Sequence, residues 1–140
     1  EYQVLEAKAN GADAILLIAA CLERSDIQTL SALAKQLGME VLLEVHNADE
    51  LEKFIMPSID MIGVNNRDLT SFRVSLETSK SLVDQIPTEF IKLSESGLSS
   101  PESVLELRDC GYQGFLMGEH FMKTDDPGVS AQHFIKSLSK

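Results

Sequence analysis

The sequence lacks an excess of basic residues, which narrows the partners that it can have. Its 140 residues include 12 lysines and arginines against 22 aspartates and glutamates, so the formal net charge is −10. A chain this acidic is repelled by nucleic acid and by anionic membrane surfaces, and we expect neither as a partner. A phosphorylated small molecule stays possible, because a few backbone N–H groups can bind phosphate against a distant negative field.

Long apolar runs and paired cysteines are also missing. No run approaches the ~20 apolar residues that a membrane-spanning helix needs. Cys21 and Cys110 fit no CxxC or metal-ligand spacing, and the first residues, Glu1-Tyr2-Gln3, carry no signal-peptide pattern. We therefore expect a cytoplasmic protein with reduced thiols. The length predicts one domain, and the missing initiator methionine indicates that the native N-terminus lies elsewhere.

The chain has the pattern of a regular alternation of helices with short strands. Five apolar runs predict strands buried on both faces, as in a parallel sheet covered by helices; they span residues 14–19, 41–45, 61–64, 90–93 and 114–118. Apolar residues at helical spacing predict helices before, between and after these runs. The signals that mark helix ends are Ser25 with Gln28, Asn47 with Glu50, Ser100-Pro101, Asp126-Pro127, Gly38 and Gly111.

Five such units fit two architectures. One is a complete, flavodoxin-like doubly wound sheet, and the other is five-eighths of an eight-stranded barrel, which typically needs about 250 residues. The chain opens with a predicted helix at residues 1–10, so the strand that should precede this helix is missing. No glycine-rich loop follows the first predicted strand either. Both features favour the barrel segment.

Polar residues occur at the strand ends, where either architecture places function. Glu44 lies within the apolar run at residues 41–45, where loss of solvation favours the protonated form and suits the carboxyl to proton transfer. The alternative is a structural salt bridge inside the barrel. His46, at the end of this run, is interpreted as an ordinary loop or capping histidine.

The segment Asn65-Asn66-Arg67-Asp68-Leu69 ends the third predicted strand. Asn65 offers both a donor and an acceptor, and the planar fork of Arg67 suits a carboxylate or a phosphate. The alternative is a simple turn at Asn65-Asn66 with a surface pair of Arg67 and Asp68.

Two further loops combine glycine with polar residues, after the fourth and fifth predicted strands. The first, Ser94–Ser99, holds hydroxyls, a carboxylate and Gly97, which lets the backbone approach a ligand closely. The second, Met117-Gly118-Glu119, precedes a short helical turn. In a barrel, phosphate commonly binds between the loops of the last two strands. Glu119 would repel a phosphate, so only its backbone N–H is a candidate contact.

Together these segments resemble strands four to eight of indole-3-glycerol phosphate synthase, in order and in spacing. The segments that carry the resemblance are Ala14–Ile18, Leu43-Glu44-Val45-His46, residues 62–69, Ser94–Leu98 and Phe115–Glu119, with Asn65-Asn66-Arg67-Asp68 and Glu95-Ser96-Gly97 the most specific. The resemblance implies an α/β fold, an incomplete (β/α)8 TIM barrel made of the C-terminal five βα units preceded by the third helix. Residues 1–140 would then be the C-terminal part of a single domain.

The resemblance also implies an activity in tryptophan biosynthesis that needs no cofactor and no metal. The family closes the ring of 1-(2-carboxyphenylamino)-1-deoxyribulose 5-phosphate, a phosphorylated small molecule, with loss of CO2 and water. It implies catalytic roles for Glu44, Asn65 and Glu95 and substrate positioning by Arg67. The other implied contacts are a phosphate site from Ser96, Gly97, Gly118 and Glu119, and an apolar wall around the aromatic ring from Leu16, Ile18, Leu69 and Met117.

One departure from the family pattern concerns lysine. The family's general acid is a lysine that ends the third barrel strand, upstream of Glu1, and a Glu-x-Lys pair that ends the first strand is absent as well. Lys92 lies mid-strand, while Lys8 and Lys35 lie on helices that would face outward, so none of them replaces it. We therefore expect no appreciable synthase activity from this chain alone.

Two other interpretations stay open. A stand-alone half-barrel would bind phosphorylated ligands without catalysis, or would self-associate through its exposed sheet edges and apolar inner face. The second interpretation is another phosphate-binding barrel enzyme, such as phosphoribosylanthranilate isomerase, although the segment Asn65-Asn66-Arg67-Asp68 argues against it.

Overall fold

A computed structural model describes residues 1–138, in which five strands form one parallel sheet. Their order is β1-β2-β3-β4-β5, so each strand pairs with its neighbours in the sequence. The strands are β1 (Ala14–Ile18), β2 (Glu40–Val45), β3 (Met61–Asn65), β4 (Ile91–Glu95) and β5 (Gly114–Leu116). The helices are α1 (Tyr2–Ala9), α2 (Arg24–Gln36), α3 (Ala48–Phe54), α4 (Glu77–Leu82), α5 (Pro101–Cys110), α6 (Glu119–Met122) and α7 (Pro127–Ser137), with 3-10 turns η1 (Ala19–Cys21) and η2 (Val83–Gln85).

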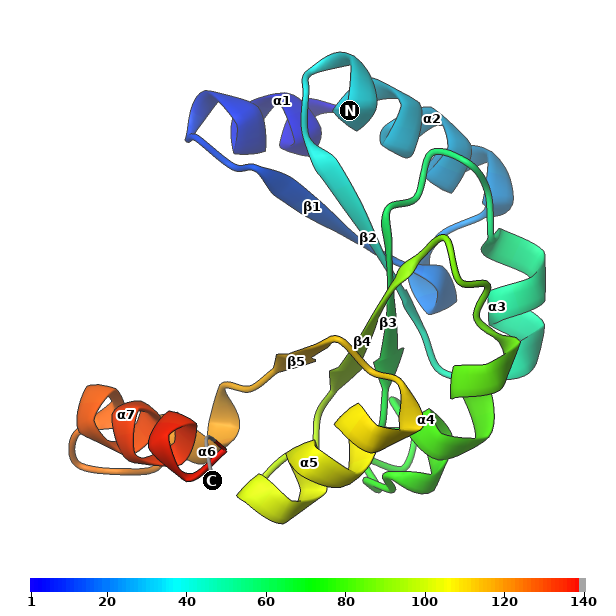
Figure 1. Cartoon of the computed structure of the whole chain (residues 1–140). Helices are drawn as coiled ribbons and strands as arrows, with labels where there is room; N and C mark the ends of the chain where they lie inside the picture. Colours follow the sequence, from blue (N-terminus) through cyan, green and yellow to red (C-terminus); the bar gives the residue numbers. More distant parts are fainter. Residues whose placement is uncertain (139–140) are drawn as a thin grey trace.

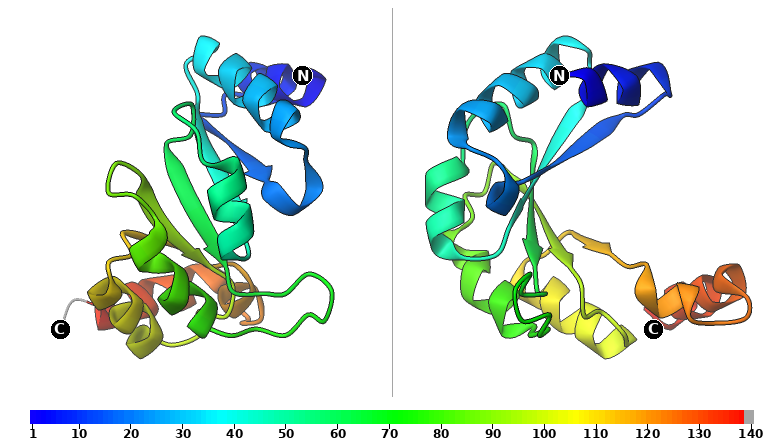
Figure 2. Two further views of the ribbon diagram at one scale, coloured as in Figure 1. Left: turned by 90° about the vertical axis from the view of Figure 1, so that its right-hand side faces the viewer. Right: turned by 180° about the vertical axis from the view of Figure 1, so that it is seen from behind.

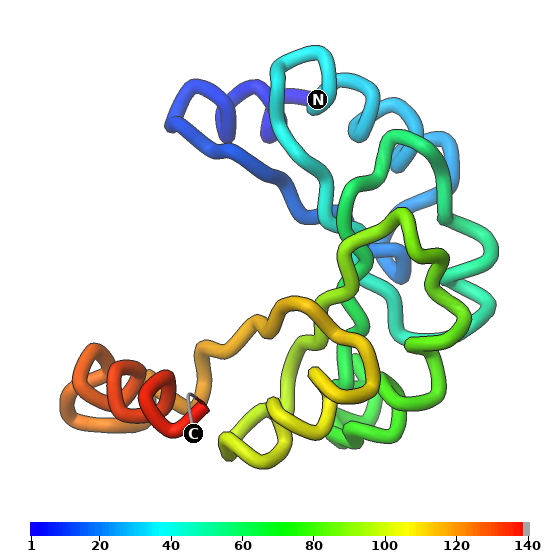
Figure 3. The backbone as a smooth tube through the Cα atoms, viewed as in Figure 1, coloured from blue at the N-terminus to red at the C-terminus, as the bar shows by residue number. Residues whose placement is uncertain are grey.

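The sheet curves into an open arc with helices along its outer side. Helices α2, α3, α4 and α5 follow the convex side in turn, while α1 lies at one end of the arc and α6 with α7 at the other (Figures 1 and 2). The backbone trace leaves the inner, concave side uncovered (Figure 3). A doubly wound sheet has helices on both faces and a strand order that reverses. The α/β barrel segment is therefore confirmed, and the doubly wound alternative is wrong.

Alternate residues along the strands face the helices on the convex side and the open concave side. Side chains on the convex face, such as Leu43 on β2 and Ile62 on β3, are fully buried under the helices. On the concave face Leu16, Ile91 and Leu116 are 48%, 43% and 46% exposed. Successive side chains of a strand point to opposite faces, so a run that is apolar throughout puts apolar groups on both. The core of this chain lies between sheet and helices.

Most predicted helix ends are confirmed. Asn47 caps α3 by accepting a hydrogen bond from Glu50 N at 2.8 Å, and Asp126 caps α7. Gly111 ends α5 with φ +115°, a conformation that favours glycine. The predicted capping box of Ser25 with Gln28 is wrong. The N-cap lies two residues earlier, at Glu23, and α2 begins at Arg24, because the Asp26 carboxylate accepts a hydrogen bond from the backbone N of Glu23. No helix within residues 1–138 has the length and apolar character needed to cross a membrane.

Two elements are shorter than the sequence predicts. Strand β5 ends at Leu116, because it is an edge strand and pairs with only three residues of β4. The helix expected from about residue 75 begins at Glu77. The preceding loop folds back on itself through an antiparallel bridge between Arg67 and Val74, which holds residues 66–75 out of the helix.

Candidate active site

Three of the predicted catalytic side chains meet at the carboxyl ends of the central strands. Glu44 comes from β2, Asn65 from β3 and Glu95 from β4, and the strand register places Asn65 beside Glu95. The amide Nδ2 of Asn65 donates to Oε1 of Glu44 at 3.1 Å. Both carboxyl groups are more than nine-tenths buried. The curvature of the sheet thus brings two carboxyls and an amide onto one concave surface.

Glu95 sits in a space that a glycine leaves open. Gly63, on the neighbouring strand, has no side chain, and a Cβ there would collide with Oε1 of Glu95. This oxygen is buried and has no hydrogen-bond partner among residues 1–138. Burial, and next the negative charge of Glu44, raise the pKa of Glu95 to about 8. At neutral pH the group is therefore a protonated acid beside an ionisable partner.

The raised pKa of Glu95 predicts how stability depends on pH. Between about pH 4.5 and about pH 8 the folded chain holds a proton on Glu95 that the unfolded chain has released, so the free energy of unfolding falls as pH rises through this window. Glu95→Gln should flatten this fall. Above pH 8 we expect the variant to be more stable by roughly 2 kcal/mol, since one unit of pKa shift corresponds to about 1.4 kcal/mol and water on the open concave side screens part of the charge.

Urea unfolding of both proteins, measured at intervals across this window, checks this expectation. Near pH 3 the two free energies of unfolding should differ by the same amount as a neutral replacement causes, without a contribution from charge, because Glu95 is neutral in both the folded and the unfolded parent chain. A parent curve that stays level between the two pKa values would contradict the assignment of a buried, protonated carboxyl.

His46 lies closer to the site than the sequence interpretation placed it. Its ring nitrogen Nε2 is 3.3 Å from Oε1 of Glu44, and Nδ1 is 3.2 Å from Oε2 of Glu50. The signal was present as a histidine two residues after Glu44 and four before Glu50, but a helix N-cap explained it equally well. Gly63 was also missed, because its importance depends on a side chain from the next strand.

A second polar region lies between the loops that follow β3, β4 and β5. A hollow of about 540 Å³ is lined by Arg67, Val74, Gly97, Leu98, Ser99, Glu119, His120 and Lys123. Nη2 of Arg67 is 2.7 Å from Oε2 of Glu119, and Nζ of Lys123 is 2.6 Å from Oε1. Lys123 and then Arg67 hold the pKa of Glu119 below its usual range. The two cations make this hollow suitable for an anionic group.

Two of the four predicted phosphate residues line this hollow. Gly97 and Glu119 line it, while Ser96 and Gly118 are their immediate neighbours in the chain. Ser96 and Gly97 both have a left-handed backbone, with φ of +66° and +75°, where the chain turns away from β4. The proposed surface pair of Arg67 with Asp68 is not formed. Arg67 pairs with Glu119, and Asp68 instead accepts hydrogen bonds from the backbone of Thr70 and Ser71.

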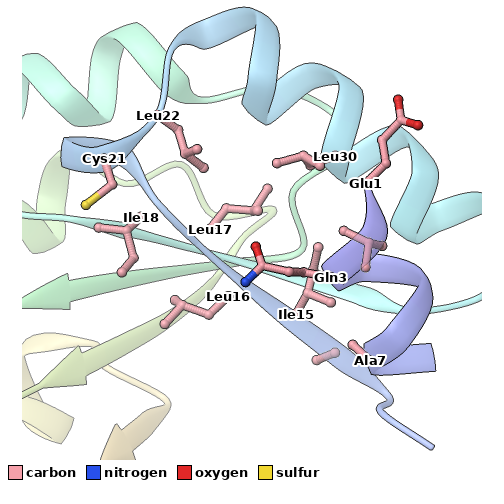
Figure 4. Close-up of a pocket in the computed structure, with 12 residues that line it drawn as sticks. Glu1, Gln3, Ala7, Ile15, Leu16, Leu17, Ile18, Cys21, Leu22 and Leu30 are labelled. Carbon is pink, nitrogen blue, oxygen red and sulfur yellow. The ribbon is translucent and has the colours of Figure 1, made fainter. Parts of the chain in front are cut away.

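The four residues predicted to form an apolar wall lie in three separate places. Leu16 and Ile18 line a hollow of about 500 Å³ along β1, where they point to one side of the strand and Leu17 to the other (Figure 4). Met117 lines a different hollow, against α7, and Leu69 is 44% exposed in the loop after β3. Because β1 and β5 are opposite edges of the sheet, these residues do not contact one another, and their shared role stays a prediction.

A buried polar network fixes the loops that carry these residues. Nδ2 of Asn66 donates to Oγ of Ser94 at 3.0 Å and to the carbonyl of Ser96 at 3.2 Å, and its Oδ1 accepts from Ser79 N at 3.1 Å. Tyr112 OH donates to the Ser79 carbonyl at 2.8 Å, and burial raises the pKa of this tyrosine to about 12. The network ties the ends of β3 and β4 to α4.

Comparison with known proteins gives the family. The family model described as indole-3-glycerol phosphate synthase matches residues 1–137. The chain belongs to the indole-3-glycerol phosphate synthase family. The chain is 51% identical to the indole-3-glycerol phosphate synthase of Bacteroides thetaiotaomicron over 99% of its own length and 53% of that protein, and 48% identical to that of Polaromonas naphthalenivorans over 92% and 49%. It thus spans about half the length of the curated relatives it matches.

Solved structures place the fold in the same class as the family. The chain superposes on 3-hexulose-6-phosphate synthase from Salmonella typhimurium with a TM-score of 0.79 and 15% identity, covering 98% of this chain and 66% of that one. The tryptophan synthase α-subunit of Pyrococcus furiosus gives a TM-score of 0.73 and 19% identity, with coverage of 98% and 59%. Both likenesses concern the fold alone, and they support the barrel segment.

Among residues 1–138, no group of three or more acidic, histidine or cysteine side chains could hold a metal ion.

Proposed function

We propose that the chain supplies the carboxylate-bearing part of an indole-3-glycerol phosphate synthase active site, a carboxy-lyase. The reaction is the ring closure of 1-(2-carboxyphenylamino)-1-deoxyribulose 5-phosphate, with loss of CO2 and water, to indole-3-glycerol phosphate. The observation that carries the proposal is the convergence of Glu44, Asn65 and Glu95 at the carboxyl ends of three parallel strands. This is the face of the sheet where barrel enzymes bind and convert their substrates.

Each group has a role that follows from its surroundings. An ionised Glu44 stabilises positive charge on the substrate nitrogen or accepts a proton, and Asn65 orients it through the 3.1 Å hydrogen bond. Glu95, with its pKa raised to about 8, donates a hydrogen bond or a proton. Arg67 and Lys123 bind the anionic groups of the substrate in the hollow beside them, once Glu119 has moved away.

The chain alone is expected to be inactive, because no lysine among residues 1–138 forms a hydrogen bond or an ion pair with Glu44 or Glu95, as a proton donor at this site would. Lys92 Nζ donates to the carbonyl of Val83 at 2.6 Å, on the helical side of the sheet, and Lys35 pairs with Asp60. The family's general-acid lysine would come from the part of the relatives that this chain does not span.

A chimaera tests the proposal. The part of the Bacteroides thetaiotaomicron relative that precedes its match to this chain would be joined to Glu1, and product formation would be followed by indole-glycerol fluorescence. We expect turnover by the chimaera, none by the 140-residue chain, and a loss of about 10²–10⁴-fold in kcat for Glu44→Gln. Glu77→Gln, an exposed change on α4, is the matched control and should leave kcat unchanged. A well-folded chimaera without turnover would sink the proposal.

The exposed concave face supports a second candidate, which is self-association without catalysis. Leu16, Ile91 and Leu116 leave apolar groups open to water along the inner face, and β1 and β5 each have one unpaired edge. Light scattering of the chain at several concentrations distinguishes this case, because a monomer at all concentrations would exclude it.

The match to the synthase family leaves no support for the isomerase interpretation, and a cytoplasmic location stays a prediction.

A further inference from the structure

The ring of His46 is held between two carboxylates. Nε2 lies 3.3 Å from Oε1 of Glu44, and Nδ1 lies 3.2 Å from Oε2 of Glu50, while only 11% of the side chain is exposed. A neutral ring has one N–H and one lone pair, so it would turn a lone pair towards one of these carboxylates. Nδ1 is within hydrogen-bonding distance and geometry of Glu50, whereas Nε2 is buried and makes no hydrogen bond within residues 1–138, although it lies beside the Glu44 carboxyl. A positive charge on this ring would therefore lie between two carboxylates.

The Glu50 carboxylate is also held by hydrogen bonds that do not involve the ring. Its Oε2 also accepts from the backbone N of His46 at 2.8 Å, and its Oε1 accepts from Nδ2 of Asn47 at 3.0 Å. Both oxygens are thus occupied by the N-terminal cap of α3. The charged groups that face His46 are Glu44 from its own strand, Glu50 from α3 and Asp68 from the loop after β3, and all three are acidic.

The surroundings of the two buried carboxyls differ accordingly. Oε1 of Glu44 accepts a hydrogen bond from the Asn65 amide and has Nε2 of His46 3.3 Å away. Oε1 of Glu95 is buried without a hydrogen-bond partner among the described residues. Two neighbouring buried carboxyls resist simultaneous ionisation, so at neutral pH the pair keeps one proton.

We propose that His46, clamped by Glu50, is a positioning residue that keeps Glu44 ionised, so that Glu95 is the group that carries the proton of the pair. The elevated pKa of Glu95 agrees with this distribution. The inference deepens the proposed function and depends on it for its catalytic meaning, since an ionised Glu44 and a protonated Glu95 are the forms that the ring closure would use. Its test needs no turnover, and it therefore succeeds or fails independently of the synthase activity.

The proposal is tested by carbon-13 NMR of the chain labelled at glutamate side chains. The carboxyl signals of Glu44 and Glu95 are assigned with Glu44→Gln and Glu95→Gln and followed as the pH is raised. In the parent, nearly all of the change at the step near pH 8 should occur at Glu95. In His46→Gln, which keeps a neutral donor but removes the charge, roughly a third or more of that change should move to Glu44, because coupled groups share a titration step.

Two further variants make the result decisive. Glu50→Gln keeps the ring but weakens its clamp, and it should move the distribution in the same direction by less, so the proposal stays testable if His46→Gln does not fold. His133→Gln removes an exposed imidazole on α7 and should change nothing. A step that stays on Glu95 in both His46→Gln and Glu50→Gln overturns the proposal, and so does an equal redistribution in His133→Gln.

Discussion

Asn66→Ala is expected to lower the free energy of unfolding by roughly 2–4 kcal/mol, a large loss for one side chain. The Asn66 amide is 2% exposed and donates to Ser94 and to the carbonyl of Ser96, while it accepts from the backbone of Ser79. Its removal leaves buried donors and acceptors without partners, and water has little access to replace it. Urea unfolding at neutral pH measures the loss.

Asn65→Ala is the matched control for this change. The two asparagines are adjacent, but the Asn65 side chain lies on the concave side, where water can reach it. We expect Asn65→Ala to lower the free energy of unfolding by about 1 kcal/mol or less, while in the chimaera it should lower kcat. Equal losses of stability in the two variants would mean that the network does not hold the loops together.

Gly63→Ala is expected to reduce kcat of the chimaera about 100-fold, because a displacement of roughly 1 Å at a reacting group has an effect of this size. The new Cβ would collide with Oε1 of Glu95 and would lie 3.1 Å from Cδ1 of Leu42. The backbone of β3 is held by strands on both sides, so the Glu95 carboxyl has to move. Steady-state kinetics should place the effect in kcat more than in KM.

Gly114→Ala separates this displacement from general crowding of the concave face. There the new Cβ would collide with Cδ2 of Leu93, the flexible end of an apolar side chain, and Glu95 is not touched. We expect a loss in kcat of less than about tenfold, since the tip of a leucine can adjust its rotamer. Similar kinetic losses in both variants would argue against a specific function for the space over Gly63.

The sheet could be predicted from the sequence because its strands are apolar on both faces. The run at 14–19 is β1 (Ala14–Ile18), and the run at 61–64 is β3 (Met61–Asn65). The last strand was overestimated, since apolar character continues to Met117 while hydrogen-bonded pairing ends at Leu116. Helix starts were predictable where a single cap was present, as at Asn47. The start of α2 was not predictable, because Glu23 with Asp26 forms the N-cap in place of Ser25.

The site was predictable only as far as strand ends could reveal it. Parallel strands deliver their carboxyl ends to one edge, which predicts that Glu44, Asn65 and Glu95 lie on the same side of the sheet, whereas their selection as catalytic residues came from the family resemblance. The buried function of Asn66 depends on Ser79 and Ser94, which lie 13 and 28 positions away along the chain. The pairing of Arg67 with Glu119, 52 positions away, likewise replaced the local pair with Asp68. Contacts of this range are set by packing, and no local pattern encodes them.

The sequential order of the strands has a consequence for how the chain is made. Every strand pairs only with the strands just before and just after it in the sequence. Within residues 14–116, each of β2 to β5 therefore pairs with a strand that was made just before it. The loop that closes at each step is one helix and its connections, so the entropy lost per step stays small. The arc can assemble in the direction of synthesis, one unit at a time.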